Sequence, residues 1–383
     1  MTTSKNSEWP KVKFGDVVRN VNATTKDPAS IGLERVVGLD HMDPESLPLK
    51  RWDELSDLNE GTSFTRIFRS GQVLFGKRRA YQKKVSVPDF DGICSGDILV
   101  FEPSSDLLLP DFLPYIVQSD GFFEHALGTS AGSLSPRTKW QELAKYEFVL
   151  PPVEEQRTIS DVLDQAKILE ERVIVAIHQV WRTRNSILGN WINGAEQESN
   201  DFLDAVAEVN PPVNRLNENS PFVTMDAVPI LDRAPMYFEK KGSRGGARAS
   251  ANDILFARIT PCLENGKTCQ VPETIEACGG STELLVIRTR GRVPQDLIFH
   301  WATSNQIRSL AEGRMSGSTG RQRLGANDLG RLPFPNPNSF DAMELVAKLN
   351  GLENLGKRLS EYLVTAQLVT RQLREDRLKA RNV

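Results

Sequence analysis

Apolar residues recur at spacings of three and four over two long stretches of the chain. The first stretch carries them at Ile159, Leu163, Ala166, Leu169, Val173, Ala176 and Val180. The second carries them at Leu345, Leu349, Leu352, Leu355, Leu359, Tyr362 and Ala366. This period is typical of an α-helix that buries one narrow stripe against a partner. We therefore predict two long helices, each of which packs against the other.

Short β-rich runs and helical runs fill the remainder of the chain. The runs GQVLFGKR, GDILVFEP, NDILFAR and TELLVIRT are bounded by Gly, Asp and Pro, as strands are. The runs PDFLPYIVQSDGFFEHAL and PQDLIFHWATSNQIRSLAEG show helical periodicity instead. These patterns predict an α+β fold with two globular parts of mixed α and β structure. They do not give the order of the strands.

The chain contains an internal repeat. A shift of 186 residues places Leu143, Phe148 and Pro151 on Leu329, Phe334 and Pro337, and it places one helical stripe on the other. Upstream the shift becomes smaller. Residues 112–120 match 297–305 at a shift of 185, and residues 73–78 match 254–259 at a shift of 181. Small insertions of this kind belong in loops. The sequence therefore indicates two copies of one globule-plus-helix unit.

The repeat predicts four successive parts of the chain, which are a globule at 1–153, a helix at 154–197, a second globule at 198–338 and a second helix at 339–383. Two equivalent units with mutually packed helices are most simply related by a pseudo-twofold axis, which makes the helices antiparallel. A helix over 154–192 is about 58 Å long and would act as a spacer. Asn338 or Ser339 is expected to cap the second helix, with Asp341 in its first turn.

The composition of the chain predicts its cellular compartment and shows how its charged residues are distributed. The chain has 383 residues, a net charge of −3 and four cysteines, none of which shows metal-ligand spacing. We therefore expect free thiols in a reducing compartment, with neither zinc nor disulfides. Because we find no apolar run of about eighteen residues and no charged-then-apolar leader, we expect a cytoplasmic protein. The weakly negative net charge conceals local clusters of cations, and a partner bound at such a cluster would experience a positive potential.

Several motifs of the sequence resemble those of a known protein family. The helix entrance VLPPVEEQRTI, the internal repeat, the GDILV and DILFAR strands and the segment MSGSTGRQRLGANDL resemble the specificity subunit of type I restriction-modification systems. The resemblance extends over essentially the whole chain and includes the order of its parts. The second helix entrance, PFPNPNSFDAMEL, departs from the first because it lacks EEQ, so docking at that end is expected to be less symmetric.

The resemblance implies both a function and partners. Such a subunit carries two target recognition domains, each of which reads one half of a bipartite, asymmetric double-stranded DNA sequence. Its long helices act as a ruler and as the platform for two modification (adenine methyltransferase) subunits. Restriction subunits, which translocate and cut DNA, join the assembly. Duplex DNA read in two half-sites also suits two similar modules at a fixed separation.

Basic residues in both copies are the candidate DNA contacts, because long cations reach phosphates and groove edges. They are, with one tyrosine, Lys77, Arg78, Arg79, Tyr81, Lys83, Lys84, Arg137, Lys139, Lys240, Lys241, Arg244, Arg248, Arg258, Lys267, Arg321 and Arg323. For the clusters at 77–84 and 239–250 the alternative is a solvated surface loop. For the loops TSAGSLSPRTKW and MSGSTGRQRLGAN the alternative is a structural turn that packs the globule onto the base of its helix.

The first turn of the first helix is a candidate surface for a partner protein. Glu155, Gln156 and Arg157 are expected to contact a methyltransferase subunit, and the alternative is that they only cap and solvate the helix. The stripe residues of both helices are expected to form core.

Catalytic sites are not expected in this chain. The string VNPPV at 209–213 is similar to the motif with which amino-methyltransferases hold a flipped adenine, but Val213 cannot stack on a base as an aromatic residue would. We find no glycine-rich strand-to-helix turn for S-adenosylmethionine, no carboxylate cluster with a lysine for a metal-dependent nuclease and no Walker spacing. We therefore expect no cofactor, no metal and no enzymatic activity of the chain by itself.

Two other classes of function are also compatible with the sequence. The first is a protein-binding scaffold, in which the basic loops are incidental to the grip on protein partners. The second is an autonomous DNA-modifying enzyme whose site is assembled between the globules. Steep loss of affinity with salt distinguishes a DNA reader from the scaffold, because neutralised phosphates release counterions. Activity of the purified chain without other subunits distinguishes the enzyme.

Overall fold

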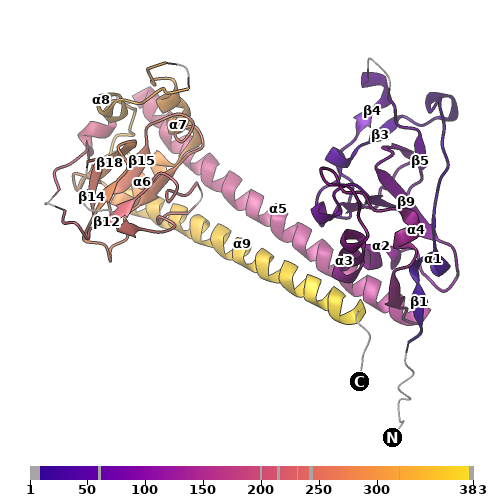
Figure 1. The fold of residues 1–383 in the computed structure, drawn as a ribbon. Helices are drawn as coiled ribbons and strands as arrows, with labels where there is room; N and C mark the ends of the chain where they lie inside the picture. The colour runs from indigo at the N-terminus through magenta and orange to yellow at the C-terminus, as the bar shows by residue number, and fades with distance from the viewer. Residues whose placement is uncertain are drawn as a thin grey trace, which may run out of the picture. The chain divides into compact units, whose positions relative to one another are not determined.

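The structure is a computed structural model, and it describes residues 9–58, 62–198, 201–213, 216–230, 232–240, 245–318 and 320–378. The chain divides into two compact units, which are described separately below. Unit 1 consists of Met1–Arg172 together with Tyr362–Val383, and unit 2 consists of Val173–Glu361. The two long helices of Figure 1, α5 (Val153–Glu198) and α9 (Ala342–Leu378), each contribute residues to both units. None of the described helices is long and apolar enough to cross a membrane.

Unit 1 is built from two small four-stranded sheets and one strand pair. The first sheet has the order β2 (Val18–Asn20), β9 (Ile98–Pro103), β6 (Val73–Gly76) and β7 (Val85–Ser86). The second has the order β4 (Asp53–Glu54), β3 (Arg35–Val37), β8 (Gly92–Cys94) and β5 (Arg66–Phe68). Strand β1 (Lys11–Lys13) pairs with β10 (Glu147–Val149). The short helices are α1 (Phe14–Val17), α2 (Leu113–Val117), α3 (Asp120–Gly128) and α4 (Trp140–Leu143).

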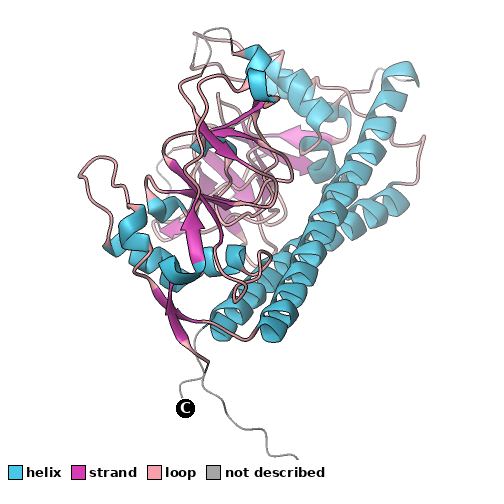
Figure 2. Ribbon diagram, turned by 90° about the vertical axis from the view of Figure 1, so that its right-hand side faces the viewer, coloured by secondary structure: helices cyan, strands magenta, loops and turns pink. Residues whose placement is uncertain are grey.

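Unit 2 repeats the two four-stranded sheets of unit 1. Its first sheet has the order β11 (Ala207–Val209), β18 (Leu284–Thr289), β15 (Ile254–Ala257) and β16 (Thr268–Gln270). Its second has the order β13 (Glu239–Lys240), β12 (Pro221–Val223), β17 (Ala277–Gly280) and β14 (Ala247–Ser250). The short helices are α6 (Gln295–Ala302), α7 (Asn305–Glu312) and α8 (Ala326–Gly330). Figure 2 separates these helices and strands by colour.

The match between the units extends to the direction of each strand and to single side chains. In both second sheets one pair is parallel, β3 with β8 and β12 with β17, whereas the other pairs are antiparallel. Ser119 caps α3 and Ser304 caps α7, and each hydroxyl accepts a hydrogen bond from the amide three residues later. The predicted α+β class and the internal repeat are therefore confirmed.

The core of each globule includes residues of the long helices. Ile159 and Leu163 of α5 are buried with the aromatic side chains Phe14, Phe75 and Phe101 of unit 1. In unit 2, core residues from the ends of both long helices, Leu188, Ile192, Val346 and Leu349, are buried with Trp301 and Phe334. The stripe residues therefore join globule and helix, in addition to joining helix to helix.

The long helices run antiparallel within each unit. In unit 1 the Thr370 hydroxyl donates to Glu170 Oε1 over 2.7 Å, and Leu373 packs on the core that contains Leu163. In unit 2 the rings of Trp191 and Phe340 lie 5.3 Å apart. Ten residues earlier in α5, Trp181 lies against Gly356, where an added Cβ would stand 3.1 Å from the indole ring. A residue without a side chain thus lets the indole approach α9.

Two details of the helices differ from the sequence expectations. Asp341, and not Asn338 or Ser339, caps α9, because its Oδ1 accepts hydrogen bonds from the amides of Met343 and Glu344. Leu169, Leu355 and Tyr362, which belong to the predicted stripes, are exposed. The expectation that every stripe residue forms core is therefore wrong at these positions.

Candidate nucleic-acid interface

The first basic cluster follows β6 and forms a tight loop around a single 3₁₀ turn, Ala80–Gln82. Arg79 and Lys83 flank this turn with left-handed φ angles of 54° and 49°. The Arg79 amide donates to the Pro136 carbonyl, and the Lys77 amide donates to the Asp97 carbonyl. The loop is therefore held on both sides by backbone hydrogen bonds, and Tyr81 at its tip is 57% exposed.

Some cationic side chains of this loop have hydrogen-bond or ion-pair partners within the protein, and others have none in the described ranges. Lys83 forms ion pairs with Glu45 and Asp120, and the Lys84 ammonium donates to the Leu39 carbonyl over 2.6 Å. The side chains of Lys77 and Arg79 have no hydrogen-bond or ion-pair partner in the described ranges. Burial, and then the nearby Arg66, lower the pKa of Lys77. A cation without a hydrogen-bonded partner would gain from a phosphate neighbour.

The loop before α4 forms a small hairpin that leans on the first cluster. Ala131 and Arg137 exchange both backbone hydrogen bonds, and the Arg78 guanidinium reaches the Ser135 hydroxyl. Leu134 lies at the tip of this hairpin and is 90% exposed. Sequence reasoning did not select Leu134 as a contact, although it is the one leucine of TSAGSLSPRTKW and stands between polar neighbours.

Arg137 and Arg323 have equivalent internal partners in the two units. Arg137 donates through Nε to Asp97 Oδ1 over 2.8 Å, and Arg323 donates through Nη2 to Glu283 Oε1 over 2.7 Å. The hydrogen bond from Arg137 is the main cause that lowers the pKa of Asp97, and the hydrogen bond from Arg323 does the same for Glu283. These contacts favour the structural-turn alternative for both loops.

The second unit places cations along a hollow beside its sheets. Arg248 of β14 and Arg258 after β15 line this hollow together with residues 210–213, the NPPV segment. Asn210 holds the segment in place, because its Oδ1 accepts a hydrogen bond from the Val286 amide over 3.0 Å. The Arg258 Nε is buried and has no hydrogen-bond partner within the described ranges. Two guanidinium groups in a hollow are suited to phosphate oxygens.

The remaining candidates are dispersed. Lys139, Lys240 and Arg321 are exposed. Lys267 is engaged, because its ammonium donates to the Met225 carbonyl over 2.8 Å. Lys241 and Arg244 lie outside the described residues. In unit 1 the structure therefore brings together Lys77, Arg78, Arg79 and Arg137, and in unit 2 it brings together Arg248 and Arg258.

The candidate partner surface at the start of α5 is reduced to two residues. The Gln156 side chain is fully buried, and it bonds to the Leu109 amide and to the carbonyls of Leu107 and Pro151. Its amide group matches a backbone donor and two backbone acceptors, so it anchors a loop to the helix and is not available to a partner. Glu155 and Arg157 are exposed.

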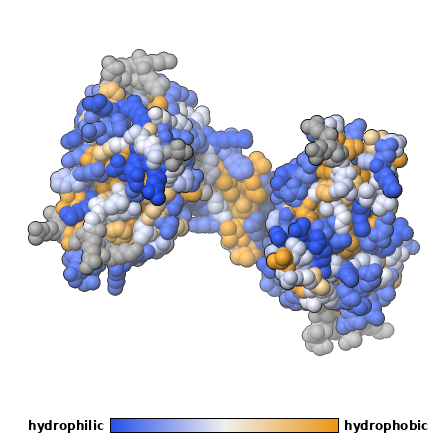
Figure 3. All heavy atoms as spheres, turned by 45° about the horizontal axis from the view of Figure 1, so that its top comes forward, coloured by the Kyte–Doolittle hydropathy of each residue, from blue (hydrophilic) through white to orange (hydrophobic). Residues whose placement is uncertain are grey.

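Exposed apolar residues on the long helices are a second candidate surface, which the sequence analysis did not predict. In unit 1 they are Val162, Ile168 and Leu169 of α5 and Tyr362, Val364, Leu368 and Val369 of α9. Figure 3 shows hydrophobic side chains gathered on an exposed part of the long helices. A contiguous apolar surface on a helix pair is typical of a protein-interaction site.

Groups that could hold a metal ion are not found in the described ranges, where three or more His, Cys, Asp or Glu side chains never converge. The four cysteines are free thiols, and burial raises the pKa of Cys94 to about 12. One of the four histidines, His300, is buried in unit 2, and its Nε2 is hydrogen-bonded to Asn350 Oδ1.

Comparison with known proteins finds similarity to one family over the first part of the chain. Residues 6–179 match the family model of the type I restriction modification DNA specificity domain. The chain is 25% identical over 193 residues to the type I restriction enzyme EcoDI specificity subunit of Escherichia coli, a match that covers 49% of this chain and 42% of that protein. It is 26% identical over 182 residues to the EcoAI specificity subunit of Escherichia coli, with 45% and 31% covered. The chain thus matches less than half of the length of these curated relatives.

Solved structures share the fold over nearly the whole chain. A chain from a structural study of complex assembly in the type I restriction-modification system aligns with a TM-score of 0.59 and 17% identity, covering 97% of this chain and 98% of that one. The type I restriction-modification S subunit from M. genitalium aligns with a TM-score of 0.56 and 12% identity, covering 99% and 98%. Residues 6–179 thus resemble the type I restriction modification DNA specificity domain, and the whole chain shares the fold of these two solved structures.

Proposed function

We propose that this chain recognises a bipartite, asymmetric sequence in duplex DNA, with one half-site read by each globule. The observation that carries this proposal is the duplicated sheet topology, in which equivalent loops after β6 and β15 carry cations. Two copies of one reader on a single chain suit a target in two halves. The residues proposed to contact DNA are Lys77, Arg78, Arg79, Tyr81 and Lys139 in the first globule and Lys240, Arg248, Arg258 and Arg321 in the second.

The long helices are proposed to set the distance between the half-sites. Helix α5 is continuous over 46 residues, and its two ends enter the cores of the two units. A continuous helix resists bending more strongly than a loop does. The number of residues between the two globules would therefore fix the number of unread base pairs between the half-sites.

The chemistry is proposed to lie in partner subunits. Two modification subunits would dock on the exposed apolar residues of α5 and α9 and on Glu155 and Arg157, and restriction subunits would join the complex. The NPPV segment keeps a structural role here, because Asn210 is bonded to the backbone of β18 and Val213 offers no aromatic ring. We place the complex in the cytoplasm, where host DNA is accessible to it.

The proposal is tested by mapping methylated adenines in cells with and without the gene, and then by measuring DNA binding of the assembled complex. Loss of one bipartite methylated motif on deletion would identify the target. Affinity for that duplex should fall steeply with salt, and Lys77→Gln with Arg79→Gln should reduce the slope of log K against log salt by about one per phosphate contact removed. Lys145→Gln, an exposed lysine paired to Glu142, is the matched control.

Two outcomes would refute this function. Affinity that does not change with salt, together with tight capture of the modification subunits, would indicate a protein scaffold. Methylation or cleavage of DNA by the purified chain alone would indicate an autonomous enzyme.

A further inference from the structure

A hollow in unit 2 contains two arginine side chains. It has a volume of about 190 Å³ and is lined by Trp181, Arg184 and Asn185 of α5, by Phe299 of α6, and by Asn305 and Arg308 of α7. This is room for several water molecules or a small ligand. None of the lining residues is among the candidate DNA contacts.

Arg184 is buried in the wall of this hollow with only part of its hydrogen-bonding capacity used. The residue is 5% exposed, and its Nη2 donates to His300 Nδ1 over 3.0 Å and to the Thr303 hydroxyl over 2.8 Å. Burial lowers the pKa of His300 to about 4, so the imidazole is neutral and adds no positive charge. The Nε of Arg184 is buried and has no partner among the described residues.

Arg184 forms no ion pair with a carboxylate in the described ranges of the chain. Glu353, the acidic group whose charge acts on Arg184, is itself engaged with Arg233 over 2.9 Å and with Lys357 over 3.1 Å. Both hydrogen-bond partners of Arg184 are neutral groups. A buried guanidinium without an opposite charge is unfavourable, because removal from water is not offset by a partner.

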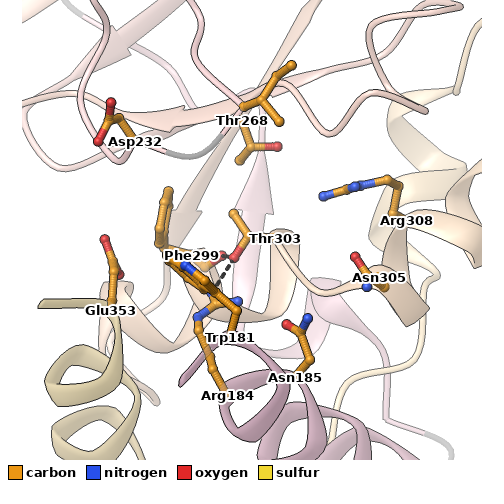
Figure 4. A pocket seen from close by; sticks show the side chains of 11 residues that line it. Trp181, Arg184, Asn185, Asp232, Thr268, Phe299, Thr303, Asn305, Arg308 and Glu353 are labelled. Carbon is orange, nitrogen blue, oxygen red and sulfur yellow. Dashed lines mark hydrogen bonds between the residues drawn. The ribbon is translucent and has the colours of Figure 1, made fainter. Parts of the chain in front are cut away.

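Arg308 supplies the second cation. Its guanidinium lies over Gly266, where an added Cβ would stand 2.3 Å from Cζ, so the glycine leaves the space that the arginine occupies. Arg308 has no ion pair or side-chain hydrogen bond within the described ranges, and burial lowers the pKa of its guanidinium. Figure 4 shows Arg308 extending from α7 into the hollow, with Asn305 and Asn185 on the same side and with Asp232 and Glu353 on the opposite side of Phe299.

The polar and apolar walls together define the ligand chemistry. Guanidinium groups match the oxygens of phosphate and carboxylate in geometry and charge, and the amides of Asn185 and Asn305 add neutral donors. Trp181 and Phe299 provide a flat apolar wall. We propose that this hollow binds a small oxyanion, a phosphate or carboxylate group, whose charge neutralises Arg184 and Arg308. The site does not depend on DNA recognition, so it stands or falls separately from the proposed function.

The test is calorimetric titration of the full chain with inorganic phosphate and with succinate, at constant ionic strength set by chloride. Saturable binding of either anion to the wild type is expected, and Arg308→Gln should weaken it about ten-fold, as expected for a charge-assisted hydrogen bond. Arg331→Gln, which removes an exposed arginine of the same unit outside the hollow, should leave binding unchanged.

Three results would overturn the proposal. The first is no binding of phosphate or succinate at millimolar concentration, and the second is equal binding by the wild type and Arg308→Gln. The third is displacement of bound phosphate by duplex DNA, because the hollow would then hold a backbone phosphate and not a small ligand. Arg184→Gln should also abolish binding, and Arg308→Gln provides the decisive comparison if that buried substitution prevents folding.

Discussion

Glu353→Gln tests the buried ionic network that joins α9 to the second globule. Glu353 is 5% exposed and accepts from Arg233, which also contacts Asn350 and pairs with Asp296 of α6 over 2.9 Å. Burial by itself would raise the pKa of Glu353. The hydrogen bond and charge of Arg233, followed by those of Lys357, outweigh that effect and hold the pKa at about 2 instead of the ordinary 4.5.

The size of the effect follows from this difference in pKa. Since one pKa unit corresponds to about 1.4 kcal/mol, ionised Glu353 stabilises unit 2 by about 3 kcal/mol at pH 7. The folded-state pKa is depressed, so this stabilisation is complete above pH 4.5 and is lost as the pH falls toward 2. At pH 3 about 1 kcal/mol should remain. Glutamine keeps the shape of the side chain but cannot carry the charge.

The assay is urea unfolding at pH 7 and at pH 3, followed by the fluorescence of tryptophans such as Trp181, Trp191 and Trp301 in unit 2. The variant should be less stable than the wild type by about 3 kcal/mol at pH 7, and the gap should shrink to about 1 kcal/mol at pH 3. Glu344→Gln, which removes an exposed pair with Lys348, should cost less than about 0.5 kcal/mol. A gap that does not change with pH, or one no larger than that of the control, would refute the reasoning.

Three further predictions concern DNA recognition. Asp97→Asn should loosen the Arg137 hairpin and weaken recognition of one half-site only, whereas Glu283→Gln should affect only the other, as measured by binding to duplexes with each half-site altered. Leu134→Ser should leave the melting temperature unchanged but lower DNA affinity, because an exposed apolar side chain beside cations is suited to contact with base steps; equal affinity would exclude that role. Deleting four residues from the middle of α5 should change the helix length by about 6 Å and alter the preferred spacing between half-sites in the methylation map, and an unchanged spacing would contradict the ruler.

The repeat and the long helices were accessible from the sequence because their signals are periodic. Leu143, Phe148 and Pro151 keep a constant shift to their counterparts, since they lie where each globule meets its helix and the packing there allows no insertion. Strand order was not accessible. The parallel pairing of β3 with β8 joins segments more than fifty residues apart, and neither run is longer than three residues.

The candidate site was predicted less completely, for a specific reason at each residue. Arg137 and Arg323 were expected equally to grip phosphate or to hold a turn, yet the shift of 186 residues that relates them also relates Asp97 to Glu283. An acid that recurs in both copies at the same shift as the cation was the available signal for an internal ion pair. Gln156 gave no such signal, because a glutamine beside two glutamates at a helix entrance looks exposed in the sequence.

The use of residues from both ends of the chain in unit 1 has a consequence for its biosynthesis. Glu375 near the C-terminus accepts hydrogen bonds from the amide of Asp120 at the first turn of α3, and Arg371 binds the carboxylate of the same aspartate. A ribosome that has made the first globule has not yet made these partners. Unit 1 therefore completes its contacts only after α9 has been synthesised, and a truncation before Arg371 would damage the domain that was synthesised first.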